Sequence, residues 1–374
     1  MINPNRSRSP TPLEAYSNSP ELGEFLQQKR LNFTGRNFVF DAIKQFINRY
    51  SRGYFTLVGY PGMGKTAILV QLLNLYPDLI FTTTELDPNF SDRTLETLCH
   101  QLINRYQLTD IPLLEDSPQG GWLFSIILQK ISEKLSPEQR LIIAIDGVDR
   151  IDITRQTVGS NLLYLPRYLP EKVYFILSRR PYLKIKSGLL TETPSQILDL
   201  SNYSSENQQD IQAYLQLFIH NPGFQASLNR WQIQPELGLE WLKINSENNF
   251  KYISEWIAFL MSDLSSFSPL QEHSETANLF QHITPSRLTA YYQSLWQQMT
   301  AGNPTELQLK IIAGLSQNQQ GITLEAIAQQ FNEDEYDIEL ILENWIEFLQ
   351  IEMINNEIYY RLYHSHFRDF FKKL

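Results

Sequence analysis

The sequence GYPGMGKT (59–66) constrains the fold of this chain more than any other feature. It has Gly59, Gly64, Lys65 and Thr66 at the spacing of a phosphate-binding loop. Such a loop works between a buried strand and the first turn of a helix, where backbone N–H groups and the helix dipole face an anion. The flanks meet this requirement, because residues 54–59 predict a strand and residues 66–76 predict a helix.

The residue types of this loop are those that phosphate binding requires. Gly62 and Gly64 allow backbone dihedral angles that a side chain would obstruct, so the chain can approach a phosphate closely. Lys65 brings a positive charge to the terminal phosphates, and the Thr66 hydroxyl is the type of ligand that holds Mg²⁺. The predicted nucleotide contacts in and beside the loop are Gly59, Pro61, Gly62, Gly64, Lys65, Thr66 and Ala67.

Strands and helices alternate along residues 31–202. The other predicted strands are 79–86, 140–146, 172–178 and 196–201, and the other predicted helices are 37–51, 93–106 and 122–135. This alternation is typical of a parallel sheet that has helices on both faces. The expected fold of residues 31–202 is therefore α/β, a three-layer P-loop NTPase domain with a parallel sheet.

Two aspartates follow a second buried strand. The run LIIAID (141–146) is almost entirely apolar and β-branched, which predicts a strand buried on both faces. Asp146 ends this strand and is expected beside the phosphate loop, where a carboxylate can hold Mg²⁺. Asp149 is a candidate to orient the attacking water. Acidic residues are also common at strand ends and in turns, so a purely structural role stays open for both.

A third strand ends in the polar residues Ser178, Arg179 and Arg180. Parallel α/β sheets bind ligands at this edge, and an arginine there can sense a γ-phosphate. Arg179 is favoured over Arg180 because it lies nearer the strand. The alternative is a solvated basic turn.

The alternation stops near residue 203. Residues 203–302 contain long amphipathic stretches, which predict an all-helical domain. Residues 303–374 predict helices followed by IEMINNEIYYRL, in which two alternating runs flank an Asn-Asn turn and indicate a β-hairpin. Helices with such a hairpin form a winged-helix domain. Residues 1–30 begin with many Pro, Ser and Asn residues and are expected to be a disordered segment.

The charges of the predicted winged helix oppose nucleic-acid binding. No Lys or Arg lies between Ile311 and Tyr360. The acidic residues of this stretch are Glu325, Glu333, Asp334, Glu335, Asp337, Glu339, Glu343, Glu347, Glu352 and Glu357. A surface that approaches phosphates needs positive charge. The formal net charge of the chain, -10, also argues against nucleic-acid binding. We therefore expect this domain to act as an intramolecular lid or to contact protein.

Cys99 is the single cysteine of the chain and excludes an intramolecular disulfide, which fits a reducing compartment, and we expect the protein to be cytoplasmic. No segment approaches the run of about 18 apolar residues that a membrane span needs. Near the C-terminus, His364 and His366 are not spaced to share one helix face, so a metal-binding pair is not expected.

Taken in order, these motifs resemble the STAND class of signalling ATPases, close to the NACHT group, over about residues 31–374. FTGR (33–36) is similar to the family motif that lies along the nucleotide base, which implies contacts from Phe33 and Arg36. The family's sensor arginine falls on Arg179. ENNFKYISEWIAFL resembles a helix start of the helical domain, with Asn248 where glycine is usual. YRLYHSHFRDFF resembles the terminal histidine motif, which places the contact with the β-phosphate of ADP on His364.

The resemblance implies a nucleotide-dependent molecular switch that binds ATP or ADP with Mg²⁺ and hydrolyses ATP slowly, in signalling or defence. ADP would hold a closed state through His364. ATP would free a surface that binds other protein chains, which could be further copies of this chain or a separate sensor or effector. The catalytic residues would be Lys65, Asp146, Asp149 and Arg179, and the metal ligands Thr66 and Asp146.

Three other classes stay open. An AAA+-type ATPase that acts on DNA through its winged helix would bind DNA in a salt-sensitive way. A nucleotide-binding interaction module would bind without turnover. A small-molecule kinase would need a substrate pocket and an arginine-rich lid, neither of which the sequence indicates.

Overall fold

The computed structural model describes residues 20–86, 90–111, 121–151, 156, 159–181, 188–230, 233–262 and 284–373. Contacts divide the chain into two compact units. The first contains Lys65–Arg180 with the residues up to Gly59 and Lys184–Tyr203, and the second contains Ser204–Leu374 with Pro181–Leu183 and Tyr60–Gly64. The middle of the predicted phosphate loop is therefore grouped with the second unit.

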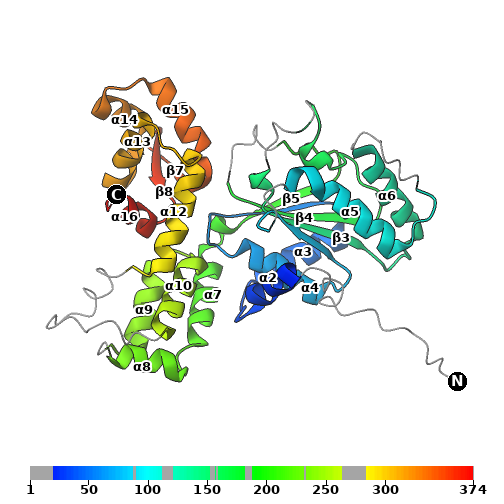
Figure 1. Cartoon of the computed structure of the whole chain (residues 1–374), viewed down its shortest axis with the longest axis horizontal. Coiled ribbons are helices and arrows are strands. Elements are labelled where there is room, and N and C mark those ends of the chain that lie inside the picture. The colour runs from blue at the N-terminus through cyan, green and yellow to red at the C-terminus, as the bar shows by residue number, and fades with distance from the viewer. Residues whose placement is uncertain are drawn as a thin grey trace. The chain divides into compact units, whose positions relative to one another are not determined.

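The first unit is built on a parallel five-stranded sheet with the order β2-β3-β4-β1-β5 (Figure 1). The strands are β1 (Gly53–Val58), β2 (Ile80–Thr83), β3 (Leu141–Asp146), β4 (Val173–Arg179) and β5 (Ser195–Asp199). Every residue of β1 and β3 is buried. This confirms the prediction of a parallel sheet and of a β3 strand that is buried on both faces.

Helices cover both faces of this sheet (Figure 1). They are α2 (Pro20–Arg30), α3 (Asn37–Arg49), α4 (Lys65–Leu75), α5 (Phe90–Tyr106) and α6 (Gly121–Lys134). Phe46 of α3 packs against Tyr174, whereas Phe124 of α6 packs against Phe175. Since neighbouring residues of a strand project to opposite faces, α3 and α6 lie on opposite sides of the sheet. The predicted α/β layering is confirmed.

The register of the strands brings their polar ends to one edge. Thr83 at the end of β2 pairs with Asp146 at the end of β3, and Val58 at the end of β1 pairs with Arg179 at the end of β4. The phosphate-loop strand and the aspartate strand are not neighbours, because β4 lies between them. The polar groups at this edge therefore come from several separate segments of the chain.

The second unit begins with helices. They are α7 (Ser204–Gln216), α8 (Pro222–Arg230), α9 (Pro235–Asn245), α10 (Phe250–Met261) and α12 (Ser286–Thr300). Their apolar faces form one core around Trp256 and Tyr252, both almost fully buried. Among the residues that the structure describes, no helix has both the length and the apolar character needed to cross a membrane.

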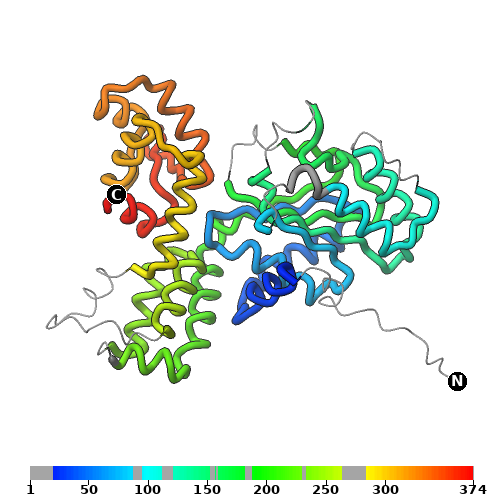
Figure 2. The backbone as a smooth tube through the Cα atoms, in the orientation of Figure 1, coloured from blue at the N-terminus to red at the C-terminus, as the bar shows by residue number. Residues whose placement is uncertain are grey.

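The same unit ends in a small sheet with its own helices, which the backbone trace shows in orange and red (Figure 2). The elements are α13 (Glu306–Gln317), β6 (Ile322–Thr323), α14 (Leu324–Phe331), α15 (Glu335–Asn344), β7 (Leu349–Ile354), β8 (Glu357–Leu362) and α16 (Ser365–Phe371). The predicted hairpin is confirmed: β7 and β8 pair in an antiparallel way, and Asn355 and Asn356 have φ angles of 52° and 67°. Asparagine tolerates this left-handed region, which the two-residue turn requires.

One sequence prediction is wrong for part of its range. Residues 1–30 were expected to be disordered, but Pro20–Arg30 forms α2, and residues 1–19 lie outside the described residues. The helix starts with proline, carries Glu21 in its first turn, and buries Phe25 and Leu26. Two buried apolar residues give too weak a periodic signal to be recognised without their tertiary contacts.

Trp345 provides a test of the packing in the second unit. Its side chain is 1% exposed, and its indole N–H donates to the carbonyl of Met299 over 2.8 Å. We expect Trp345→Phe to lower the free energy of unfolding by about 1–3 kcal/mol, because the carbonyl loses its donor and a cavity remains. Calorimetry would measure this. Trp122→Phe is the matched control, since Trp122 is 66% exposed, and a similar loss in both variants would contradict the prediction.

Candidate functional site

Asp146 is the centre of a hydrogen-bond cluster at the polar edge of the parallel sheet. Its Oδ2 accepts from the hydroxyl of Thr66 over 2.8 Å and from that of Thr83 over 3.1 Å. Its Oδ1 accepts from the hydroxyl of Ser178 over 2.5 Å. The donors lie in the first turn of α4 and at the ends of β2 and β4, so this carboxylate ties those three segments to β3.

The environment of Asp146 perturbs its ionisation in two opposite ways. The side chain is buried, which raises its pKa, whereas the hydroxyls of Ser178 and Thr66 lower the pKa by donating to the carboxylate. A buried carboxylate paired with a hydroxyl of this kind is an oxygen-rich ligand set that suits a hard divalent cation. The structure thus brings together the two residues that the sequence named as metal ligands.

Lys65 lies at the start of α4, and its amine donates to the carbonyl of Gly59 over 2.6 Å. Burial lowers the pKa of this amine to about 8, and the nearby Arg180 also lowers it, whereas Asp149 raises it. A phosphate group beside this amine would favour its charged form. The contact of Lys65 with a nucleotide stays a prediction.

The middle of the phosphate loop is fixed by the turn that precedes α10. The side-chain amide of Asn249 donates to the carbonyl of Pro61 over 3.0 Å, and the backbone N–H of Lys251 donates to the carbonyl of Gly62 over 3.0 Å. The Asn249 side-chain oxygen also caps α10 by accepting from Tyr252 N–H over 3.1 Å. Gly62 has a φ of +83°, and a Cβ there would collide with the Asn249 carboxamide.

The second aspartate is bound by the arginine that the sequence analysis set aside. Asp149 accepts from the backbone N–H of Arg180 over 3.1 Å and forms an ion pair with its guanidinium at 3.4 Å. Both side chains are buried. Arg179, the favoured sensor, lies at the end of β4, where its guanidinium donates to the carbonyl of Arg180 and its own carbonyl accepts from Gly59 N–H.

The remaining predicted nucleotide contacts have clear positions but no tested role. Phe33 and Arg36 lie in the turn that leads into α3, where Phe33 packs against Phe40 and Arg36 has a φ of 66°. Ala67 lies in the first turn of α4. Their contacts with a nucleotide stay predictions.

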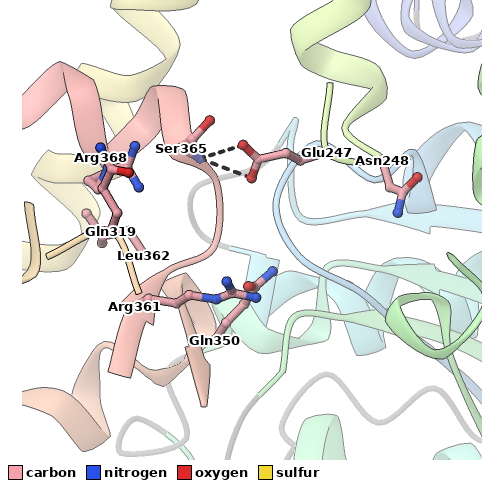
Figure 3. A pocket seen from close by; sticks show the side chains of 8 residues that line it. All are labelled: Glu247, Asn248, Gln319, Gln350, Arg361, Leu362, Ser365 and Arg368. Atoms are coloured by element: carbon pink, nitrogen blue, oxygen red, sulfur yellow. Dashed lines mark hydrogen bonds between the residues drawn. The ribbon is translucent and has the colours of Figure 1, made fainter. Parts of the chain in front are cut away.

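His364 is buried within the second unit, and both of its ring nitrogens have partners. Nδ1 accepts from the backbone N–H of His366 over 3.1 Å, so Nε2 carries the proton and donates to the carbonyl of Ser246 over 3.0 Å. Burial lowers its pKa, which favours the neutral ring. The adjacent Ser365 N–H donates to the Glu247 carboxylate (Figure 3).

This segment borders a polar cavity of about 400 Å³ in the second unit (Figure 3). Arg361 and Arg368 line it together with Glu247. We assign it no ligand.

Sequence reasoning missed Asn249, Ser178, Thr83 and Arg180 as site residues. Ser178 and Arg180 belong to a polar strand end that was recognised, and Asn249 belongs to a segment that was quoted for its likeness to a helix start. Thr83 lies in the run TTT with no distinguishing signal. Their partners are distant in sequence, as for Asn249 and Pro61, which are 188 positions apart.

The geometry of this edge agrees with what comparison with known proteins finds. Residues 32–176 match the family described as AAA ATPase domain. This segment is similar to an AAA-type P-loop ATPase domain. It contains β1 to β3, most of β4, the phosphate loop and both aspartates. Nucleotide binding is expected for such a domain.

One curated protein and one solved structure are also similar to this chain. The telomerase protein component 1 of Mus musculus is 30% identical over 141 residues, which are 34% of this chain but 5% of the relative. This chain thus spans only about a twentieth of the curated relative. The Walker-type ATPase paby2304 of Pyrococcus abyssi has 12% identity and a TM-score of 0.59, and the likeness covers 91% of this chain and 96% of that one. The second likeness concerns the fold alone.

The lowered pKa of Lys65 predicts that nucleotide binding takes up protons. With a pKa of about 8, part of its population is neutral near pH 8 in the nucleotide-free protein, and phosphate binding restores the charge. We expect ADP binding at about pH 8 to take up about half a proton per nucleotide. Calorimetry in buffers of different ionisation enthalpy would measure it. Lys65→Arg, which stays charged, should show a smaller uptake, and equal uptake in both proteins would contradict the assignment.

The hydrogen bond between Asn249 and Pro61 predicts that Asn249 contributes to nucleotide affinity. Asn249→Ala leaves the Pro61 carbonyl without its donor and loosens the loop around Gly62. We expect the dissociation constant for ATP to rise about tenfold, from the loss of one buried hydrogen bond. Fluorescent-nucleotide titration would measure it. The matched control is Asn303→Ala, because Asn303 is exposed in the turn between α12 and α13, and an equal effect in both variants would count against a role in the loop.

Proposed function

We propose that this chain is a nucleotide-dependent molecular switch that binds ATP or ADP with Mg²⁺ and hydrolyses ATP slowly. The observation that carries the proposal is the direct hydrogen bond of 2.8 Å between the Thr66 hydroxyl and the buried Asp146 carboxylate, beside Lys65. It supports a site that takes phosphates and a divalent cation together.

Thr66 and Asp146 are the residues that would hold Mg²⁺, and the cation would supply charge neutralisation to the phosphates. Lys65 contributes the fixed positive charge of the loop. Asp149 is proposed to orient the attacking water, with Arg180 fixing the position of its carboxylate through two contacts. Arg179 is proposed as the γ-phosphate sensor, at the strand end next to the loop.

The switch part of the proposal is supported by the way the loop is anchored. Pro61 and Gly62 accept hydrogen bonds from Asn249 and Lys251 at the start of α10, and Tyr60 stacks on Tyr363, which precedes His364. A change in the loop on nucleotide exchange therefore alters contacts made by α10 and by the segment before α16. Such coupling shifts a conformational equilibrium only by the difference in nucleotide affinity between the states.

We infer that α13, α14, α15 and the β7–β8 hairpin form a winged helix, and that His364 is its nucleotide-sensing residue. In the ADP state we propose that the Nε2–H of His364 donates to the β-phosphate instead of to Ser246. Release of that contact would free the protein for assembly with other chains in signalling or defence. Action on DNA is disfavoured, since residues 311–360 contain acidic residues and no Lys or Arg.

The test is to denature the purified protein and to identify any released nucleotide by chromatography. We expect near-stoichiometric ADP from the wild-type protein and little from His364→Ala, because the contact that holds the closed state is lost. His364→Gln, which can keep an N–H donor, should retain part of it. His100→Ala is the control, since His100 is exposed in α5.

The proposal has two ways to fail. If ADP or ATP with Mg²⁺ neither copurifies nor raises the melting temperature, nucleotide binding itself is wrong. If nucleotide binds but His364→Ala and His100→Ala retain it equally, the role of His364 is wrong while the ATPase site stands. Salt-sensitive binding of duplex DNA would instead support the DNA-acting class.

A further inference from the structure

The β7–β8 hairpin has an apolar face that is buried at its base and open at its tip. Residues opposite each other in an antiparallel pair project to the same face, as do alternate residues of one strand. The register pairs Leu349 with Leu362, Ile351 with Tyr360, and Met353 with Ile358. Leu349 and Leu362 are buried, whereas Ile351, Met353 and Ile358 are 46%, 71% and 44% exposed. Adjacent exposed apolar side chains of this kind mark an interaction site.

β7 is also an edge strand. In the sheet that the structure describes, β8 lies in the middle and β7 pairs with β8 alone. Its sequence, LQIEMI, contains neither of the residues that most often protect an edge from pairing, Lys and Pro. One side of its backbone is therefore available to a further strand.

Acidic residues surround this edge. Glu352 lies on the polar face of β7, between Ile351 and Met353 in sequence. Glu339 and Glu343 of α15 lie near Tyr360, whose pKa is raised first by burial and then by these two carboxylates. No Lys, Arg or His lies between residues 311 and 360. Arg361, opposite Gln350, is the single basic residue of the hairpin, against Glu352 and Glu357. A partner at this edge must therefore combine apolar side chains with positive charge.

We propose that β7 is the docking edge for an extended basic segment of another protein, in which apolar residues alternate with Lys or Arg. Added as a strand beside β7, its apolar side chains would continue the face of Ile351 and Met353, and its basic side chains would lie on the face of Glu352. Backbone hydrogen bonds give such a complex its affinity, and alternate side chains give its specificity. The proposal goes beyond nucleotide switching and does not require turnover.

The charges separate this occupant from the others. Nucleic acid would bring more negative charge to an acidic surface. A second copy of this chain, paired antiparallel about Glu352, would place Glu352 near its own counterpart, and like charges across a strand pair are destabilising. A strand with apolar residues on one face and Lys or Arg on the other complements both faces of β7.

The experiment uses the full chain and a fluorescent peptide of alternating Lys and Val, measured by anisotropy. Two control peptides separate strand addition from simple charge attraction: one with the same composition but with its Lys residues grouped, and one with N-methyl groups on alternate backbone nitrogens. We expect the alternating peptide to bind at least about tenfold more tightly than either control.

The protein variants test the surface itself. Ile351→Ser with Met353→Ser removes the exposed apolar face, and Glu352→Lys reverses the charge, so each should weaken binding about tenfold. Leu309→Ser is the matched control, since Leu309 is an exposed apolar residue of α13, 48% accessible, and it should leave the affinity unchanged. Melting temperatures would show that the variants remain folded.

Several outcomes would overturn the proposal. Equal binding of the three peptides to the wild-type protein would mean that charge alone attracts them. Equal binding by the wild-type protein and both β7 variants would place the peptide elsewhere. Self-association that the Ile351→Ser, Met353→Ser variant abolishes would make a second copy the occupant, and duplex DNA that competes with the peptide would make it nucleic acid.

Discussion

The buried carboxylate of Asp146 is the constraint on which the rest of the site depends. A carboxylate out of water is costly unless hydrogen bonds satisfy its oxygens. Here Thr66, Thr83 and Ser178 donate to it. Because these donors belong to different segments at the strand tips, satisfying Asp146 fixes how the tips of β2 and β4 and the start of α4 lie around β3. The same bonds place a hydroxyl and a carboxylate where a phosphate-bound cation would need them.

The phosphate loop is also anchored by two hydrogen bonds from the start of α10. Asn249 donates to the carbonyl of Pro61, and the backbone N–H of Lys251 donates to the carbonyl of Gly62. Gly62 is necessary for two reasons: its backbone has a positive φ, and Asn249 occupies the space that a Cβ would fill. Within the second unit, residues 61 and 62 of the loop are thus held by the turn that starts α10. This anchoring is the observation on which the proposed switch rests.

The charge and the exposure of the C-terminal sheet together restrict the kinds of partner that it can bind. Its hairpin is the kind of element that enters a nucleic-acid groove in other proteins, but residues 311–360 contain ten acidic residues and no Lys or Arg, and Arg361 is the single basic residue of the hairpin. Its exposed residues are apolar on one face, and β7 leaves an edge open. These properties are the basis on which we propose a protein partner, because backbone pairing and apolar contact do not require positive charge on this side.

Several parts of the fold could be predicted because they depend on local sequence pattern. The phosphate loop, the parallel sheet, the position of Asp146 and the Asn-Asn hairpin were all predicted, because each follows from periodicity or from a fixed spacing within a few residues. Contacts between side chains that are far apart in the sequence depend on tertiary packing. That Arg180 rather than Arg179 pairs with Asp149, that Asn249 reaches Pro61, and that Pro20–Arg30 is helical all depend on packing partners that lie far away in the sequence. Local pattern fixes backbone conformation and strand order constrains the edge, but the direction of each side chain is set by the atoms around it.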